Sequence, residues 1–231
     1  ELEPLFRNAR CLVLHADHDE DRNALFATLS TRFAALMPNL SGGDVDLTAL
    51  IEKAQGNPLY LNVVTACLAY QQLSVTDLDA LPSGLNALWE ALLARLDSER
   101  LPLYLLAAAR APLPNRLLAK LLDLEPSALP NRLARLRPLL QESADRSAWQ
   151  LAHSALRYWL LDNAAEQVRA AHLHLVEKLQ RADPEVMELY ALQHLPAHAL
   201  RAAGGLAAFA WLTDVAFLTA RLKRVSVAEV L

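Results

Sequence analysis

Apolar residues follow a helical spacing along most of the chain. Leucine and alanine dominate, and in the middle of the chain Leu117, Leu118, Leu121 and Leu122 fall on one helix face. The same spacing continues through the segments that we expect to be helical. These are 17–36, 46–56, 57–70, 76–110 as two helices, 113–137 as two helices, 154–163, 164–180, 184–204 and the tail from Leu206. The pattern therefore predicts a mainly α fold.

Two segments depart from this pattern. Residues 10–16, "RCLVLHA", form a short apolar run that could be one strand. Residues 138–153 alternate apolar and polar positions on both sides of the polar turn "SADRS", which predicts a short β-hairpin. Helix, turn, helix and hairpin in this order make the winged-helix arrangement.

Turn residues divide the chain into three regions after its first residues. We predict a small helical bundle at 15–83, a winged-helix domain at 84–165 and a helical connector at 166–231. The connector could begin a helical array, because consecutive helices with short polar breaks pack pairwise.

Composition narrows the classes of function. The net charge of −4 gives no general basic signal for nucleic acid or membrane surfaces. The two cysteines, Cys11 and Cys67, lie in apolar runs, as reduced thiols of a cytoplasmic protein do. The most apolar late stretch contains Asp214 and falls short of a membrane span, and no secretory signal is present. Because the chain starts at Glu1 in what looks like mid-domain sequence, we expect it to be part of a longer protein.

Metal and catalytic patterns are weak. His15, Asp17 and His18 lie close together, and His194 and His198 are four residues apart, but Pro196 between this pair would kink or interrupt a helix. No nucleophile elbow, paired carboxylates or G-x-x-x-x-G-K-[S/T] phosphate loop is present in the sequence. We therefore predict no catalytic residue and no metal site, and no nucleotide hydrolysis by this chain alone.

The turn "GNPL" is a candidate for nucleotide contact. Gly56 ends one predicted helix, and Asn57 and Pro58 open the next, where the missing proline N–H costs nothing. The rigid ring of Pro58 and the neighbouring backbone groups, including those of Leu59, could flank an adenine. The alternative is an ordinary helix start.

His153 is a candidate phosphate ligand. It stands where the predicted hairpin ends and the next helix begins, and helix N-termini favour anions. The alternative is a capping or core histidine.

Three arginines raise the possibility of DNA contact. Arg132, Arg135 and Arg137 lie on the second helix of the predicted helix-turn-helix, the helix that reads DNA in many proteins. A solvated face or a protein interface is the alternative. The negative net charge of the chain and the lack of a wider basic patch argue against a nucleic-acid partner.

In order and spacing, several segments resemble the lid and winged-helix part of STAND-class signalling NTPases of the NACHT and NB-ARC type. They are "GNPLYLNVV", "LWEALLARL", "LYLLAAARAPLPNRLLAKLLDL" and "WQLAHSALRYWLL". The segments "LYALQHLPAHALRAAGG" and "LTDVAFLTARLKRVSVAEVL" are similar to the helical connector that precedes a repeat sensor in such proteins. The resemblance spans about residues 12 to 231.

This resemblance implies a role for each region. Residues 1–14 would end the nucleotide-binding core, 15–83 would be the lid, and the upstream core would bind most of the ADP or ATP with Mg²⁺. Pro58 would pack by the adenine, and His153 would contact the β-phosphate of ADP and hold the inactive state. The family further implies a C-terminal repeat sensor, homo-oligomerisation on activation, and defence or cell-death signalling.

Two other functions remain open from the residues. One is a STAND-type transcriptional regulator whose winged helix binds DNA through the three arginines. The other is a helical scaffold that makes no nucleotide contact.

Overall fold

A computed structural model describes residues 23–24, 27–28, 31, 47–180 and 188–225. The strand predicted at 10–16, most of the helix predicted at 17–36, the domain predicted at 1–14 and His15, Asp17 and His18 lie outside the described residues.

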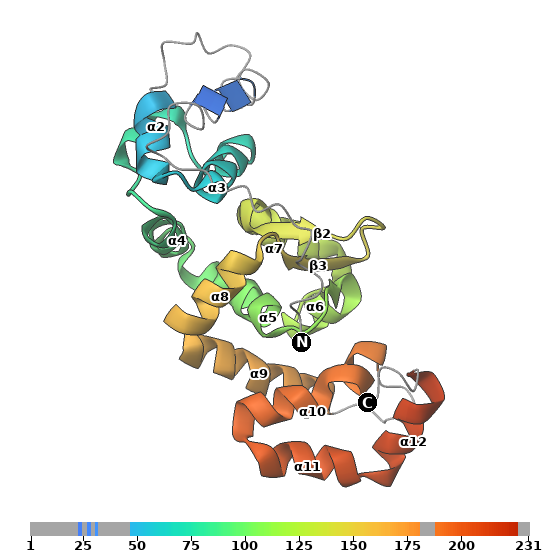
Figure 1. The fold of residues 1–231 in the computed structure, drawn as a ribbon. Coiled ribbons are helices and arrows are strands. Elements are labelled where there is room, and N and C mark those ends of the chain that lie inside the picture. Colours follow the sequence, from blue (N-terminus) through green and yellow to red (C-terminus); the bar gives the residue numbers. More distant parts are fainter. Residues whose placement is uncertain (1–22, 25–26, 29–30, 32–46, 181–187, 226–231) are drawn as a thin grey trace. The chain divides into compact units, whose positions relative to one another are not determined.

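The described residues are mainly helical and include one small three-stranded antiparallel sheet (Figure 1), which confirms the predicted fold class. The chain divides into two compact units, Glu1–Arg95 and Leu96–Leu231. We call them the first and the second unit. The second unit contains the winged helix and the connector helices together, and the domain boundaries predicted from the sequence stay predictions.

The first unit is built from short helices around a buried tyrosine. Tyr60 is fully buried, and its hydroxyl donates a hydrogen bond to the carbonyl of Pro82 at 2.8 Å. The helices α2 and α3 are in contact, as are α3 and α4. The described elements are α2 (Leu47–Ala54), α3 (Pro58–Ala69), the 3₁₀ helix η2 (Val75–Ala80) and α4 (Leu85–Ala94).

The second unit begins with the predicted winged-helix arrangement. Three strands form a sheet in the order β1-β3-β2, with β3 in the centre. The elements in chain order are the 3₁₀ helix η3 (Asp97–Arg100), α5 (Leu101–Ala108), β1 (Leu113–Pro114), α6 (Asn115–Leu121), η4 (Pro126–Ala128), α7 (Leu129–Leu133), η5 (Ala134–Leu139), β2 (Leu140–Glu142) and β3 (Ala148–Leu151). The hairpin formed by β2 and β3 confirms the prediction. The sequence pattern missed β1, because two residues are too few to show alternation.

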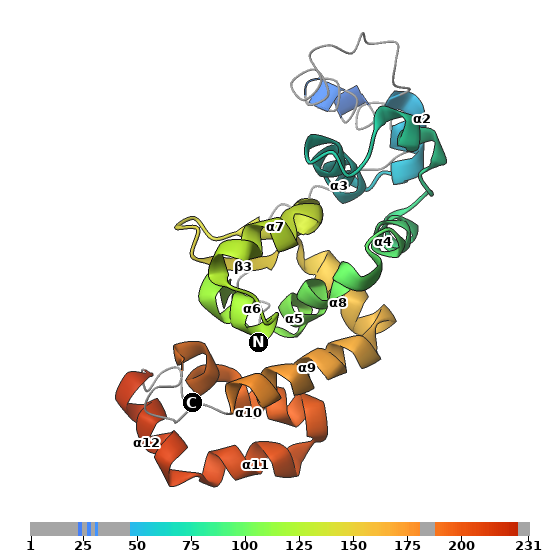
Figure 2. The same ribbon diagram turned by 180° about the vertical axis from the view of Figure 1, so that it is seen from behind.

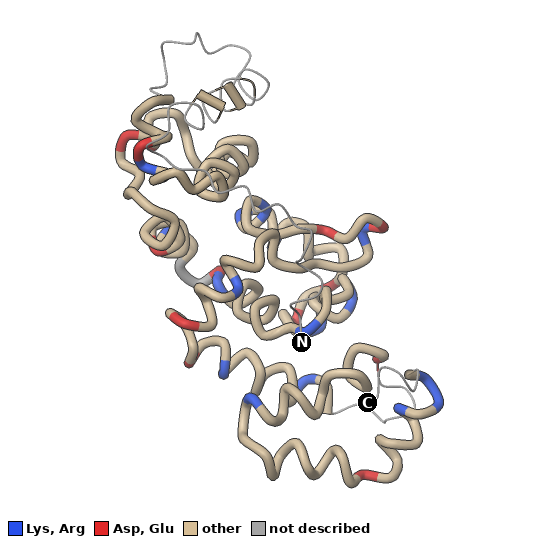
Figure 3. Tube along the Cα trace, in the orientation of Figure 1, with Lys and Arg blue, Asp and Glu red and all other residues tan. Residues whose placement is uncertain are grey.

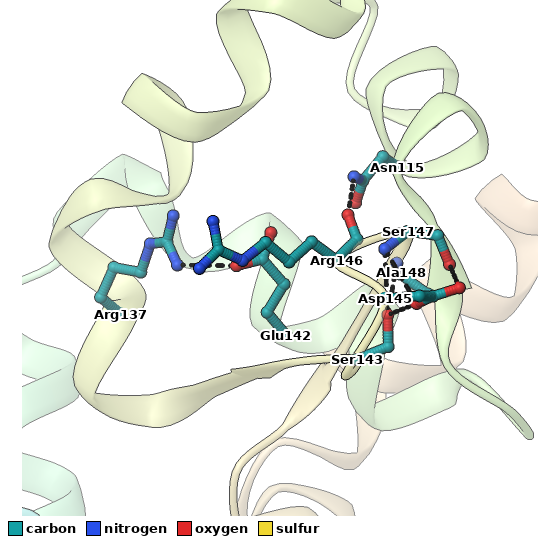
Figure 4. Close-up of polar contacts among 8 residues, drawn as sticks. All are labelled: Asn115, Arg137, Glu142, Ser143, Asp145, Arg146, Ser147 and Ala148. Carbon is teal, nitrogen blue, oxygen red and sulfur yellow. Dashed lines mark hydrogen bonds and ion pairs between the residues drawn. The ribbon is translucent and has the colours of Figure 1, made fainter.

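The wing turn between β2 and β3 is stabilised by its own polar side chains (Figure 4). Asp145 accepts hydrogen bonds from the Ser143 hydroxyl at 2.6 Å and from the Ser147 hydroxyl at 2.7 Å. These bonds favour the carboxylate and lower the pKa of Asp145 to about 2. The side-chain amide of Asn115, at the start of α6, donates to the carbonyl of Arg146 at 2.8 Å and ties the wing to the helices.

The remaining helices of the second unit match the predicted helical segments. They are α8 (Ser154–Asn163), α9 (Ala165–Leu179), α10 (Leu189–Ala203), α11 (Gly205–Thr213) and α12 (Val215–Arg224). Figure 2 shows α10 alongside α9 on one side and α11 on the other, in agreement with their contacts. Helix α10 continues through Pro196, as the helix predicted at 184–204 requires, so the proline does not interrupt it. Pro196 is buried within α10, so packing compensates for the backbone hydrogen bond that proline cannot make.

Among the described helices, none alone has the length and apolar character needed to cross a membrane. The pair α11 and α12 meets these criteria only when taken together, and the two helices are bent by 72° at the break between them.

Candidate functional site

The turn before α3 has the local structure that its sequence predicts. Helix α2 ends at Ala54, and Gly56 has a positive φ of 74°, a conformation that glycine adopts without steric cost. Asn57 is the N-cap of α3, and its side-chain oxygen accepts a hydrogen bond from the backbone N–H of Leu59 at 3.0 Å. Pro58 occupies the first helical position and is exposed. Its ring is therefore accessible to a ligand, as the adenine hypothesis requires.

The Asn57 cap is expected to stabilise the first unit measurably. Asn57→Ala leaves one N–H at the start of α3 without its side-chain partner and should lower the free energy of unfolding by about 1 kcal/mol. Urea denaturation followed by circular dichroism measures this. Asn57→Asp keeps an acceptor and adds a charge that suits the helix N-terminus, so it should retain the stability. Equal losses in the two variants would contradict the capping role.

His153 is placed at the junction of the sheet and α8. It is the N-cap residue of α8, follows β3 after one intervening residue, and makes no capping hydrogen bond with its side chain. The side chain is half-buried, and this burial lowers the pKa of His153 below its ordinary value of 6.5. The imidazole is therefore neutral at neutral pH and keeps one ring N–H to donate.

His153 lines a cavity of about 350 Å³ together with two arginines, Arg110 and Arg157. No aspartate or glutamate is among the residues that line this cavity, and Trp149 contributes an apolar wall. The guanidinium of Arg157 is oriented by a hydrogen bond from its Nε to the carbonyl of Ala107 at 3.0 Å. A half-buried cavity with two cations and one N–H donor favours an anion, and a phosphate group fits this chemistry.

The structure leaves one joint prediction untested. Pro58 belongs to the first unit and His153 to the second, and each unit is described by itself. That the two side chains face one nucleotide therefore stays a prediction.

The arginines of the predicted recognition helix are mostly engaged within the protein. The helix predicted there is short, because α7 ends at Leu133 and the chain continues as the 3₁₀ helix η5. Arg135 forms an ion pair with Glu99 at 3.4 Å. Arg137 pairs with Glu142 at 3.4 Å (Figure 4) and lies over the ring of Trp149, 4.4 Å from its centroid.

The third arginine, Arg132, is half-buried on α7. Lysines and arginines are spread over several elements of the second unit and do not gather on α7 and η5 (Figure 3). These contacts weaken the DNA hypothesis, since two of the three arginines already have acidic partners.

One histidine of α10, His198, takes part in a buried polar chain. His198 is fully buried, and its Nδ1 lies 2.8 Å from Nδ1 of His172 on α9. Its Nε2 lies 3.0 Å from the hydroxyl of Tyr190, which in turn accepts a hydrogen bond from the backbone N–H of Arg110 at 3.3 Å. Within the described part of the chain, no group of three or more histidines, cysteines or acids could hold a metal ion.

Sequence reasoning missed Arg110, Arg157, Arg201 and His172. They belong to the loop after α5, to α8, to α10 and to α9, and no motif joins them. Only the packing of these elements brings them together around two cavities.

Comparison with known proteins adds no family assignment, since no protein-family model and no curated sequence matches this chain.

Proposed function

We propose that this chain is the regulatory portion of a STAND-class signalling ATPase. In this proposal the chain distinguishes ADP from ATP and so controls autoinhibition and oligomerisation in defence or cell-death signalling. The proposal rests on the resemblance of the sequence segments and on one observation above all. His153 lines a cavity with Arg110 and Arg157, and no acidic residue is among those that line it.

The chain's own residues have distinct roles in this proposal. His153 donates a hydrogen bond from its neutral imidazole to a phosphate oxygen, and the two arginines balance the phosphate charge. Pro58 packs against the adenine, and the Asn57 cap keeps the Gly56 turn in place. An upstream nucleotide-binding domain would hold Mg²⁺ and most of the nucleotide, because this sequence contains no phosphate loop.

A hydrogen bond from His153 would couple the winged helix to the state of the nucleotide. A hydrogen bond to a charged group contributes about 1.5–3 kcal/mol. Such an energy shifts a two-state equilibrium roughly tenfold to a hundredfold. Release of this contact would then free the second unit for homo-oligomerisation, and a C-terminal repeat sensor would follow the connector helices.

Titration with ADP of the full-length protein, which includes the upstream nucleotide-binding domain, tests the proposal. We expect ADP to shift the imidazole resonances of His153 in an NMR spectrum of this protein after isotope labelling. His153→Ala should weaken ADP binding about tenfold or more, because the phosphate loses its histidine donor.

Tyr158→Ala is the matched control for this titration. Tyr158 lies on the same helix, α8, is 65% exposed and does not line the cavity, so its replacement should leave ADP affinity unchanged. An ADP affinity that is the same in His153→Ala and in the unmodified chain would refute the proposed role of His153.

A further inference from the structure

The second unit has a second cavity, which shares Arg110 and Arg157 with the cavity of His153. It measures about 490 Å³, within the range of about 300–1,000 Å³ that small-molecule sites occupy. It is lined by the end of α5, by α8, by α9 and by α10. The residues that line it are Ala107, Ala108, Arg110, Arg157, Leu161, His172, Ala197 and Arg201.

The charge of this cavity is entirely positive. Arg110, Arg157 and Arg201 line it, and no aspartate or glutamate does. In the part of the chain that the structure describes, none of these three arginines forms an ion pair. Three guanidinium groups around one cavity repel one another, and an anion inside the cavity would relieve this repulsion.

Hydrogen bonds hold the guanidinium of Arg157 and the backbone of Arg110 in position. The Nε of Arg157 donates to the carbonyl of Ala107, which leaves its two terminal nitrogens available for a ligand. The backbone N–H of Arg110 donates to the hydroxyl of Tyr190, so the loop that carries Arg110 is tied to α10. The site therefore joins one oriented guanidinium, that of Arg157, with the exposed side chains of Arg110 and Arg201.

The polar chain behind the cavity fixes the orientation of His172. A consistent assignment has the Tyr190 hydroxyl donating to Nε2 of His198 and Nδ1–H of His198 donating to Nδ1 of His172. In this assignment His172 carries its proton on Nε2. Burial first, and then the charges of Arg201, Arg157 and Arg110 in that order, together lower the pKa of His172 to about 4. The positive potential of the three arginines therefore acts on this wall of the cavity.

We propose that this cavity binds a small, multiply charged anion of the phosphate type, held by Arg110, Arg157 and Arg201. The occupant is multiply charged because three arginines line the site, and it is compact because Ala107, Ala108, Leu161 and Ala197 supply apolar walls beside them. The site goes beyond the proposed nucleotide contact, since Arg201 and His172 do not line the cavity of His153.

Calorimetric titration with inorganic pyrophosphate at low salt tests this site. We expect saturable binding that weakens at least tenfold in Arg201→Ala, because one charge-assisted contact is lost. Arg201→Lys keeps the positive charge without the planar guanidinium. Its pyrophosphate affinity should therefore lie between those of the unmodified chain and Arg201→Ala. Arg116→Ala is the matched control, since Arg116 is an exposed arginine of α6 outside the cavity. It should bind pyrophosphate as the unmodified chain does.

The pKa of His172 is a second readout, which does not depend on measuring the affinity for pyrophosphate. Pyrophosphate in the cavity would offset the charges of the arginines and should raise the pKa of His172 in an NMR pH titration. A cooperative thermal unfolding transition is the check that Arg201→Ala is folded. Full pyrophosphate affinity in folded Arg201→Ala, or an equal loss in Arg116→Ala, would overturn the proposal.

Titration with ADP separates the two possible sources of a phosphate group. ADP binding that depends on His153 and pyrophosphate binding that depends on Arg201 would support two sites, and each can fail without the other. If pyrophosphate binds only where His153 is intact, the two cavities form one nucleotide site and this proposal is wrong.

Discussion

Trp149→Ala should destabilise the second unit by about 3–5 kcal/mol, the cost of truncating a buried tryptophan. Trp149 is 2% exposed and lies on β3, the central strand, where it is paired with Leu113 of β1 and Glu142 of β2. Its removal leaves a cavity beneath the guanidinium of Arg137 and takes away a wall of the His153 cavity. A loss of this size is comparable to the whole stability of many small domains.

Chemical denaturation with hydrogen exchange read by mass spectrometry measures this effect. Exchange should rise across β2, β3 and α8, while the first unit should keep its protection. Arg137→Ala removes only the cation–π contact and the partly exposed ion pair, so it should cost about 1 kcal/mol. If Trp149→Ala were no more damaging than Arg137→Ala, the sheet would not depend on this side chain.

Acid should destabilise the second unit through His172 and His198. In the unfolded chain both imidazoles bind a proton near their ordinary pKa of 6.5. In the folded chain, burial lowers the pKa of His172 to about 4 and that of His198 to about 3. Arg201, Arg157 and Arg110 add to the shift at His172, whereas His172, His194 and Arg110 add to it at His198.

The sign of the pH dependence follows from these values. Between pH 6.5 and about 4 the unfolded chain binds more protons than the folded chain, so the free energy of unfolding falls as the pH falls. The stabilisation is fully present above pH 6.5, and the loss by pH 4 should be on the order of 3 kcal/mol for each of the two histidines. Urea denaturation at a series of pH values measures this slope.

Two variants separate the histidines from other acid effects. His198→Gln can still form hydrogen bonds but cannot take up a proton in this range, so its stability should depend less steeply on pH between 6.5 and 4. Tyr190→Phe keeps both imidazoles and loses only the hydroxyl that contacts His198, so it should keep the steep slope. Identical slopes in the unmodified chain and in His198→Gln would exclude these histidines as the cause.

Local features of the fold could be predicted from the sequence because neighbouring residues determine them. The spacing of leucines indicated the helices, and the start of α3 followed from Asn57 and Pro58. The alternation around the turn at 143–147 predicted β2 and β3. The sequence pattern missed β1 because this strand exists only through its pairing with β3.

The sequence by itself determined which segments are helical, where the wing turns, and that Pro58 and His153 stand at helix starts. Only the tertiary structure decided that Arg110, Arg157, Arg201 and His172 surround a cavity, and that Arg135 and Arg137 pair with acids. The physical reason is that helix periodicity and capping depend on residues within one or two turns. By contrast, the arginines meet around one cavity only because α5, α8, α9 and α10 bury their apolar faces against one another.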